Sequence, residues 1–259
     1  MTAINERYTR EIRNRFGYSG TWLPTTQVRV GDVGVLHNYE YVRVRSLREL
    51  GVRFRERTDT ASANLEYASA GVTSSEFTIA GEAPAASSLL GMARAGISIA
   101  FNAENAFLFS AYGCRTSSIE DQTALSHSLL GLVARGDWPD DHVVVTEVVF
   151  SERSTILASS SSGARIELSA ETTAAAGSAN LVSGSVRLRP LKAHNMALQI
   201  VAQGGLTPLF RAWGIKRRFL QQPTFVRRGQ GTGFWNQSEQ DRHPDGYFED
   251  VDYAYFVNT

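Results

Sequence analysis

Residues 95–113 read AGISIAFNAENAFLFSAYG and form the most regular stretch of this chain. Large apolar side chains occupy odd positions, and small or polar residues fill most of the even ones. The apolar residues are Ile97, Ile99, Phe101, Phe107 and Phe109. A period of two is typical of a β-strand with one face in the core and one in water. We predict one strand here, much longer than the usual five or six residues.

Similar alternation recurs on both sides of this stretch. Residues 62–80 precede it and are long enough to pair with it in an antiparallel hairpin. A β-rich segment covers 143–158, and apolar and polar residues alternate again over 165–171, 182–189 and 196–200. Together these patterns predict an α+β fold: a twisted, mostly antiparallel sheet with long hairpins and a few peripheral helices.

Helical signals are confined to short segments. In residues 4–16 apolar side chains recur every four positions between arginines, which predicts a basic amphipathic helix. A capping box predicts a single turn over 46–50, and 84–93 is a further candidate. Ser118 is expected to cap a helix that runs to about Arg135.

Charge is segregated along the chain, although the 26 basic and 26 acidic residues cancel. The net charge is +5 for residues 1–57, −6 for 58–210, +6 for 211–228 and −5 for 229–259. Of the 26 basic residues, 24 are arginine, whose guanidinium group binds phosphate through paired hydrogen bonds. A surface that binds phosphate groups of lipid or nucleic acid is one interpretation. A codon usage that favours arginine is the other.

Composition and motifs argue against several classes of protein. The chain is 42% hydrophobic and 20% charged, as in globular proteins, and it has no uninterrupted apolar run of membrane-spanning length. The first residues lack the apolar core of a signal peptide, which predicts a cytosolic start. One cysteine, Cys114, allows no internal disulfide. The five histidines show no metal-ligand spacing, and there is no nucleophile elbow. We therefore expect no catalytic residue, no metal and no cofactor.

The order of these elements resembles the pore-forming domain of gasdermins, particularly the bacterial gasdermins. The helical segment 119–135 separates two hairpin regions, as it does in that family. The short segments that carry the resemblance are GYSGTWLP (17–24), VRVGDVGVL (28–36), SLRELGVRF (46–54), VVVTEVVFSERSTILA (143–158) and IVAQGGLTPLFRAWGIK (200–216).

The resemblance implies a non-enzymatic protein that is monomeric and cytoplasmic at rest. An activating protease would remove a C-terminal restraint. The freed domain would then bind anionic lipids of the inner (plasma) membrane, form a homo-oligomer, and insert its two hairpin regions into a large β-barrel pore. In bacteria this would cause cell death in antiviral defence. Residues 1–228 would be the pore-forming domain, and 229–259 an acidic, aromatic, autoinhibitory tail.

The resemblance also assigns roles to residues, and nucleic acid is not among the expected partners. Anionic lipids are expected to bind Arg7, Arg10, Arg13, Arg15, Arg211, Lys216, Arg217 and Arg218. Membrane strands would present Ile97, Ile99, Phe101, Phe107, Phe109, Ile166, Leu168, Val186 and Leu188 to lipid. Cleavage is expected at Arg227 and Arg228, which precede GQGTG. Autoinhibition would involve Phe234, Trp235, Tyr247, Phe248, Tyr253, Tyr255 and Phe256.

Two other classes stay open. A non-enzymatic, β-rich structural, assembly or binding protein, such as a virion or secretion-system component, would explain the long strands and use the tail as an exchanged arm. A hydrolase with an unrecognised site ranks last.

The chain also lacks the cysteine near the N-terminus that carries a lipid in many bacterial gasdermins.

Overall fold

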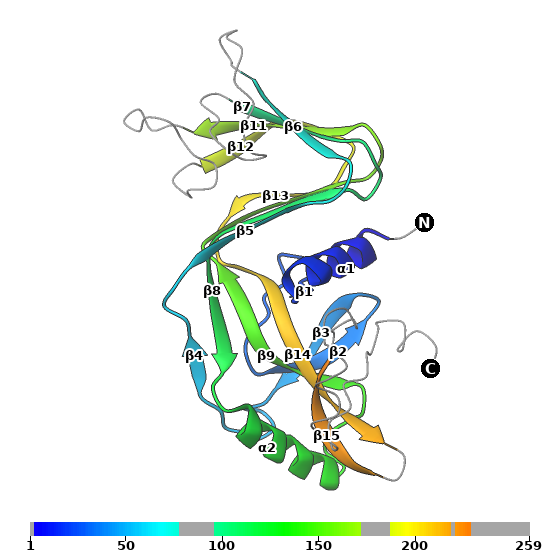
Figure 1. Cartoon of the computed structure of the whole chain (residues 1–259), viewed down its shortest axis with the longest axis vertical. Helices are drawn as coiled ribbons and strands as arrows, with labels where there is room; N and C mark the ends of the chain where they lie inside the picture. The colour runs from blue at the N-terminus through cyan, green and yellow to red at the C-terminus, as the bar shows by residue number, and fades with distance from the viewer. Residues whose placement is uncertain (1–2, 78–95, 172–186, 219–220, 229–259) are drawn as a thin grey trace, which may run out of the picture. The chain divides into compact units, whose positions relative to one another are not determined.

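The computed structural model describes residues 3–77, 96–171, 187–218 and 221–228 (Figure 1). The described helices are α1 (Ile4–Phe16) and α2 (Gln122–Ala134). The strands are β1 (Ser19–Gly20), β2 (Asp32–His37), β3 (Glu40–Ser46), β4 (Glu56–Thr58), β5 (Ala63–Ala68), β6 (Val72–Phe77), β7 (Gly96–Phe101), β8 (Phe107–Ile119), β9 (His142–Ser151), β10 (Arg153–Ser159), β11 (Ala164–Glu171), β12 (Arg187–His194), β13 (Met196–Gln203), β14 (Leu206–Arg218) and β15 (Gln221–Arg228). The described sheets are mostly antiparallel, which confirms the predicted α+β class.

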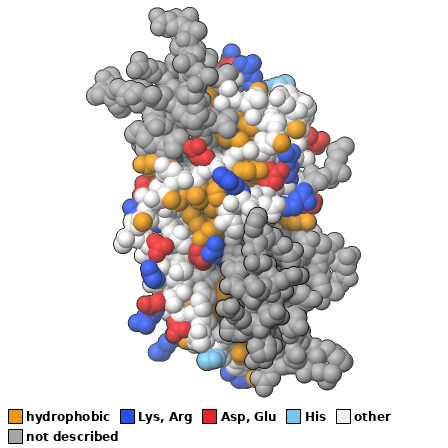
Figure 2. Space-filling model, viewed as in Figure 1, with side chains coloured by type: hydrophobic (Ala, Val, Ile, Leu, Met, Phe, Trp, Pro, Cys, Tyr) orange, Lys and Arg blue, Asp and Glu red, His pale blue; other side chains and the backbone are white. Residues whose placement is uncertain are grey.

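The chain divides into two compact units. Unit 1 comprises Met1–Tyr8, Thr60–Arg115 and Phe150–Pro208, and unit 2 comprises Thr9–Asp59, Thr116–Val149 and Leu209–Thr259. On the face drawn in Figure 2, apolar side chains form patches among charges of both signs.

Unit 1 contains two sets of four neighbouring strands. The first set is a four-stranded sheet in the order β6-β7-β11-β12. In the second set β8 pairs with β5 and β10, and β10 pairs with β13, which gives the order β5-β8-β10-β13. The predicted antiparallel pairing of residues 62–80 with residues 95–113 is confirmed, since β5 pairs with β8 and β6 with β7.

The core of unit 2 lies between helix α2 and a sheet. Leu125, Leu129 and Leu132 of α2 pack with Trp138 and with apolar residues of β2, β9 and β14. A second cluster gathers side chains of β2, β3, β9 and β14 around Phe210. These two clusters bury both an apolar helix face and the sheet beneath it.

The structure corrects two of the predicted boundaries. The long strand expected over 95–113 is interrupted, because β7 ends at Phe101 and β8 begins at Phe107. The predicted cap Ser118 remains in β8, opposite Arg57, and Asp121 caps α2 instead through its bond from the Ala124 N–H (2.9 Å).

Other expectations agree with the structure. The first helix spans Ile4–Phe16 as predicted, and the segment 46–50 forms a turn in which the Ser46 and Glu49 side chains bond each other's backbone N–H. The strand expected over 182–189 appears as β12 from Arg187 onward. Residues 182–186 and the candidate helix over 84–93 lie outside the described residues.

Candidate functional site

The four-stranded sheet of unit 1 has one apolar face. Directly opposite residues of neighbouring antiparallel strands lie on the same face. Ile99 pairs with Ile166 and Ile97 with Leu168, and each of these side chains is at most 1% exposed. Arg165, Glu167 and Ser169, which alternate with Ile166 and Leu168 in β11, are more exposed. The alternation predicted from the sequence therefore corresponds to a real division between a buried and a polar face.

This apolar face packs on the second set of strands in unit 1. The same hydrophobic cluster contains Ala106 and Leu108 of the β8 segment and Leu157 of β10, all at most 2% exposed. Val72 and Leu188 pack against its margin from β6 and β12. The four-stranded sheet is thus folded back over the strands that continue from it (Figure 1).

The segment 95–113 is interrupted between β7 and β8, and as a result the apolar residues of its two halves do not all share one face. Phe107 and Phe109 do not join the cluster of Ile97, Ile99 and Phe101. The ring of Phe107 instead meets Tyr8 of α1 edge-on, with 5.1 Å between ring centroids, and Phe109 lies 6.4 Å from the same ring. The intervening turn shifts the phase of the alternation, so the sequence pattern correctly predicts burial but groups the two halves wrongly.

Four turns mark the line along which the sheet folds back, and we call them the hinge line. Each contains one residue with a positive φ: Gly71 (+93°), Asn105 (+57°), Gly163 (+81°) and Asn195 (+52°). They join β5 to β6, β7 to β8, β10 to β11, and β12 to β13. Glycine and asparagine are the residues that tolerate this left-handed conformation best. Because both sets of strands keep the same order, the eight strands are the halves of four chain segments.

Two buried serines tie the hinge line together. Ser69 Oγ accepts a hydrogen bond from the Phe107 N–H (2.8 Å) and is part of a residue only 3% exposed. Ser159 is fully buried, and its Oγ accepts from the Ala106 N–H (3.0 Å) and donates to the Ala103 carbonyl oxygen (2.8 Å). Backbone bonds also link the turns: Asn102 N–H to Gly71 O (2.7 Å), Gly163 N–H to Phe101 O (2.8 Å) and Ser160 N–H to Asn195 O (2.9 Å).

The predicted lipid-binding residues of α1 differ in their surroundings. Tyr8 and Ile12 anchor the helix, since both are fully buried. Arg10 and Arg15 are exposed, whereas Arg13 is half-buried. Arg7 is half-buried too, and its guanidinium donates to the carbonyl oxygens of Glu104 (3.2 Å) and Ala70 (3.4 Å).

Arg211, another predicted lipid-binding residue, is engaged within unit 2. Its guanidinium pairs with Glu147 (2.9 Å) and lies 3.9 Å from the centre of the Tyr18 ring. The Tyr18 hydroxyl donates to the other oxygen of Glu147. Burial and this carboxylate raise the pKa of Tyr18 to about 12. In this conformation Arg211 serves as a structural cation.

The remaining residues with predicted roles lie at the ends of β14 and β15 or outside the described residues. Lys216, Arg217 and Arg218 end β14, and Arg227 and Arg228 end β15, whose backbone pairs with Trp213 and Ala212. Val186 and the seven aromatic residues from Phe234 to Phe256 lie outside the described residues.

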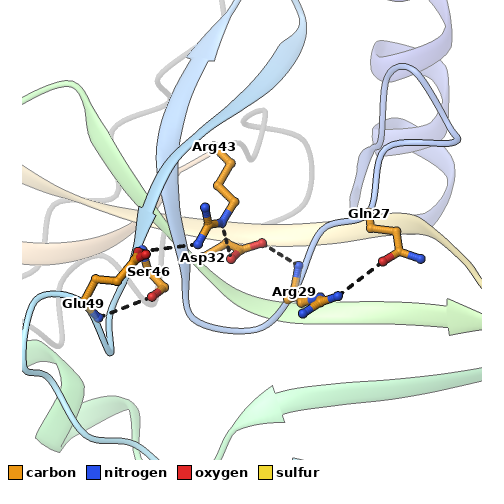
Figure 3. Close-up of polar contacts among 6 residues, drawn as sticks. All are labelled: Gln27, Arg29, Asp32, Arg43, Ser46 and Glu49. Atoms are coloured by element: carbon orange, nitrogen blue, oxygen red, sulfur yellow. Dashed lines mark hydrogen bonds and ion pairs between the residues drawn. The ribbon is translucent and has the colours of Figure 1, made fainter.

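A polar network in unit 2 was missed by sequence analysis (Figure 3). Asp32, with its side chain 7% exposed, accepts from Arg43 Nε (2.9 Å) and from the Arg29 N–H (2.9 Å). Arg43 also reaches Glu49 (3.5 Å). The Asp32 carboxylate raises the pKa of Arg43, and bonds from Ser46 lower the pKa of Glu49. The capping box reveals the Ser46–Glu49 part, but no local pattern predicts the Asp32–Arg43 contact.

Metal and thiol chemistry find little support in the described part of the chain. It contains no group of three or more His, Cys, Asp or Glu residues that could hold a metal ion. Cys114 is buried in β8, and burial raises the pKa of its thiol to about 12, which disfavours the reactive thiolate. None of the described helices has the length and apolar character needed to cross a membrane.

Comparisons with known proteins give a weak likeness in structure. No family model and no curated protein matches the chain. Among solved structures, the chain is similar to gasdermin A3 in its membrane pore, with 14% identity and a TM-score of 0.37 over 87% of this chain and 95% of that chain. Function is not transferred at this level of similarity, so it has to be inferred from the geometry.

Proposed function

We propose that this chain forms membrane pores by opening the folded sheet of unit 1. The observation that carries the proposal is the pairing of the two predicted hairpin regions in one amphipathic sheet, folded at four turns. Straightened, the four segments would run over 63–77, 96–119, 153–171 and 187–203. Each is longer than the roughly 9–11 residues that a β-strand needs to cross a bilayer.

Energetics favour lipid as the new environment of the apolar face. Opening the hinge line removes Ile97, Ile99, Ile166 and Leu168 from the cluster that contains Leu108. In water this would expose apolar surface at a cost of about 25 cal/mol per Å². Acyl chains bury the same surface again, so the cost of transfer largely disappears in a bilayer. Backbone groups at the outer edges of β6 and β12 must still be paired, because lipid offers them no hydrogen bonds. Strands of further copies would satisfy them and close a ring.

The finer parts of the proposal concern control and biological role. Residues 229–259 carry a net charge of −5 and directly follow the segment 211–228, whose net charge is +6. They would restrain residues 1–228 at rest. A protease that cuts at Arg227 or Arg228 would first need β15 to separate locally, because its backbone is paired with β14. The protein would then move from the cytoplasm to the anionic inner membrane, and the pore would kill the cell in antiviral defence. No catalytic activity is required.

Dye release from vesicles tests the proposal. A specific protease site is inserted after Arg228 in the full chain, and the protein is cut in the presence of dye-loaded phosphatidylglycerol vesicles. We expect release only after cutting, and little from phosphatidylcholine vesicles. If neither the cut nor the uncut chain releases dye at micromolar concentration, the proposal is wrong.

A matched pair of variants tests the role of the apolar face. Leu188 packs at the margin of the apolar cluster, whereas its neighbour Arg189 is exposed. Leu188→Asp places a charge where lipid would lie and should abolish release, whereas Arg189→Asp should retain it. Circular dichroism of both variants checks that they fold. Equal loss in both folded variants would argue against the assigned lipid-facing side.

An assembly protein without pore activity is the second candidate. It is favoured by the outer edges of β6 and β12, which pair with no other strand within the described residues. Ordered assemblies that form in solution without lipid, and without dye release from vesicles, would support this function over the first.

A further inference from the structure

One arginine of α1 contacts two turns of the hinge line. Arg7 Nη1 donates to the Glu104 carbonyl oxygen (3.2 Å), in the turn between β7 and β8. Arg7 Nη2 donates to the Ala70 carbonyl oxygen (3.4 Å), in the turn between β5 and β6. The two acceptors lie 34 residues apart in sequence, so a single side chain bridges two of the four turns.

The position of Arg7 is fixed from its own helix. Tyr8, the next residue, is fully buried, and its ring lies 5.1 Å from the ring of Phe107, at the start of β8. The Phe107 N–H in turn bonds to Ser69 Oγ at the end of β5. The start of α1 thus touches the same two turns through a ring contact and through a guanidinium fork.

We propose that Arg7 is a clamp on the hinge line that a lipid phosphate group releases. In the folded form the guanidinium holds the turns at Ala70 and Glu104. At an anionic membrane surface the same group binds phosphate, and the two turns lose their shared donor. Lipid binding and opening of the sheet are then coupled through one side chain. The lipid partner rests on the proposed function, whereas the clamp itself does not.

Hydrogen-bond strength explains the direction of the exchange. The carbonyl oxygens of Ala70 and Glu104 are neutral acceptors at 3.2 and 3.4 Å, which is long for such bonds. A phosphate oxygen is charged, and phosphate accepts two parallel bonds from one guanidinium group. Arg7 is half-buried, so it is also within reach of a ligand from solvent. Phosphate should therefore outcompete the carbonyl groups where its local concentration is high.

Hydrogen exchange of the full chain tests the clamp without lipid. The reporters are the Asn102, Ala106 and Phe107 amides, whose hydrogen bonds belong to the hinge line. Arg7→Gln should accelerate their exchange about fivefold, as expected for a modest local loss of hydrogen bonding. Arg7→Lys keeps the charge but loses the forked guanidinium group. Its exchange rates should fall between those of the wild-type chain and Arg7→Gln. Arg10→Gln removes the same charge from an exposed position of α1 and should change nothing. Equal effects of Arg7→Gln and Arg10→Gln would overturn the clamp.

Vesicles and phosphate test the releasing ligand. After cutting at the inserted site, phosphatidylglycerol vesicles should accelerate exchange of the same amides in the wild-type chain to the level of Arg7→Gln. They should add nothing in Arg7→Gln. Acceleration by inorganic phosphate alone would overturn the assignment to a lipid surface, and no acceleration by vesicles would overturn release. If Arg7→Gln loosens the hinge line while cut protein releases no dye, the clamp stands and the pore function fails.

Discussion

The two units bury their apolar residues in different ways. Unit 2 packs α2 over a sheet, with Trp138 fully enclosed and two ion-pair networks centred on Asp32 and Glu147. Unit 1 folds one sheet back on its own continuation and ties the fold with serine hydroxyls and left-handed turns. This core lies between the two halves of the same four segments. It can therefore open while each strand keeps its neighbours in the sheet. In the proposed function, unit 1 therefore changes conformation and unit 2 serves as the scaffold.

The largest expected effect is in the scaffold. Trp138→Ala removes a side chain that is 1% exposed and should lower the free energy of unfolding by about 3–5 kcal/mol. Trp138→Phe should cost much less, because the buried indole N–H has no hydrogen-bond partner among the described residues. Denaturant unfolding gives both values. Similar costs for the two variants would show that unit 2 is not packed as described.

The Asp32 network should have the next largest effect. Asp32→Ala leaves Arg43 and the Arg29 N–H without their shared acceptor, so we expect a loss of about 2 kcal/mol in the free energy of unfolding. Asp137, paired with Arg135 on the surface, provides the control. Asp137→Ala should fall within the error of the same denaturant measurement. If Asp32→Ala barely changes the free energy of unfolding, this network does not stabilise unit 2.

Loosening the hinge line should cost less, and the effect should be local. Ser159→Ala deprives the Ala106 N–H and the Ala103 carbonyl oxygen of a partner, which we expect to destabilise unit 1 by about 1–2 kcal/mol. Exchange at the Ala106 amide should rise, while amides of β2 and β3 stay protected. Ser128→Ala, on the exposed side of α2, is the matched control. Uniform loss of protection in both units would contradict their separate roles.

The last effect appears only at high pH, and near neutral pH it should be the smallest. The pKa of Tyr18 is about 12 in the folded state, against 10.0 for an ordinary tyrosine. The folded state therefore holds this proton more tightly, and its contribution to stability is complete below pH 10 and lost as pH rises toward 12. Tyr18→Phe should flatten the unfolding free energy over this window. If the slope between pH 10 and pH 12 is the same in both proteins, Tyr18 is not buried as described.

Local patterns predicted most of the elements but not the way they meet. The alternation of Ile97, Ile99 and Phe101 is visible in sequence because a strand with one buried face requires it. The interruption before Phe107 was not predicted, although Asn105 occupies an odd position, where the alternation calls for an apolar residue. Its left-handed backbone lies in the turn between β7 and β8. Likewise Ser118 is a good cap in isolation, but pairing with β4 holds it in β8.

The candidate site was harder to predict, because it depends on contacts distant in sequence. The sequence analysis named Arg7 and Arg211 among the lipid-binding residues, and this role stays a prediction. The sequence could not show that Glu147, 64 residues away, pairs with Arg211, or that Arg7 bonds carbonyl oxygens 63 and 97 residues away. Backbone carbonyl groups carry no sequence signal at all.

The alternation of β11 offers the most direct test of the central claim, that the apolar face of this sheet moves from core to lipid. In a Cys114→Ala background, Arg165→Cys, Ile166→Cys, Glu167→Cys and Leu168→Cys are each labelled with a fluorophore. The chain is then cut beside anionic vesicles that carry a quencher in their acyl chains. The account predicts quenching at positions 166 and 168 but not at 165 and 167. Equal quenching at all four positions, or none at any, would contradict it.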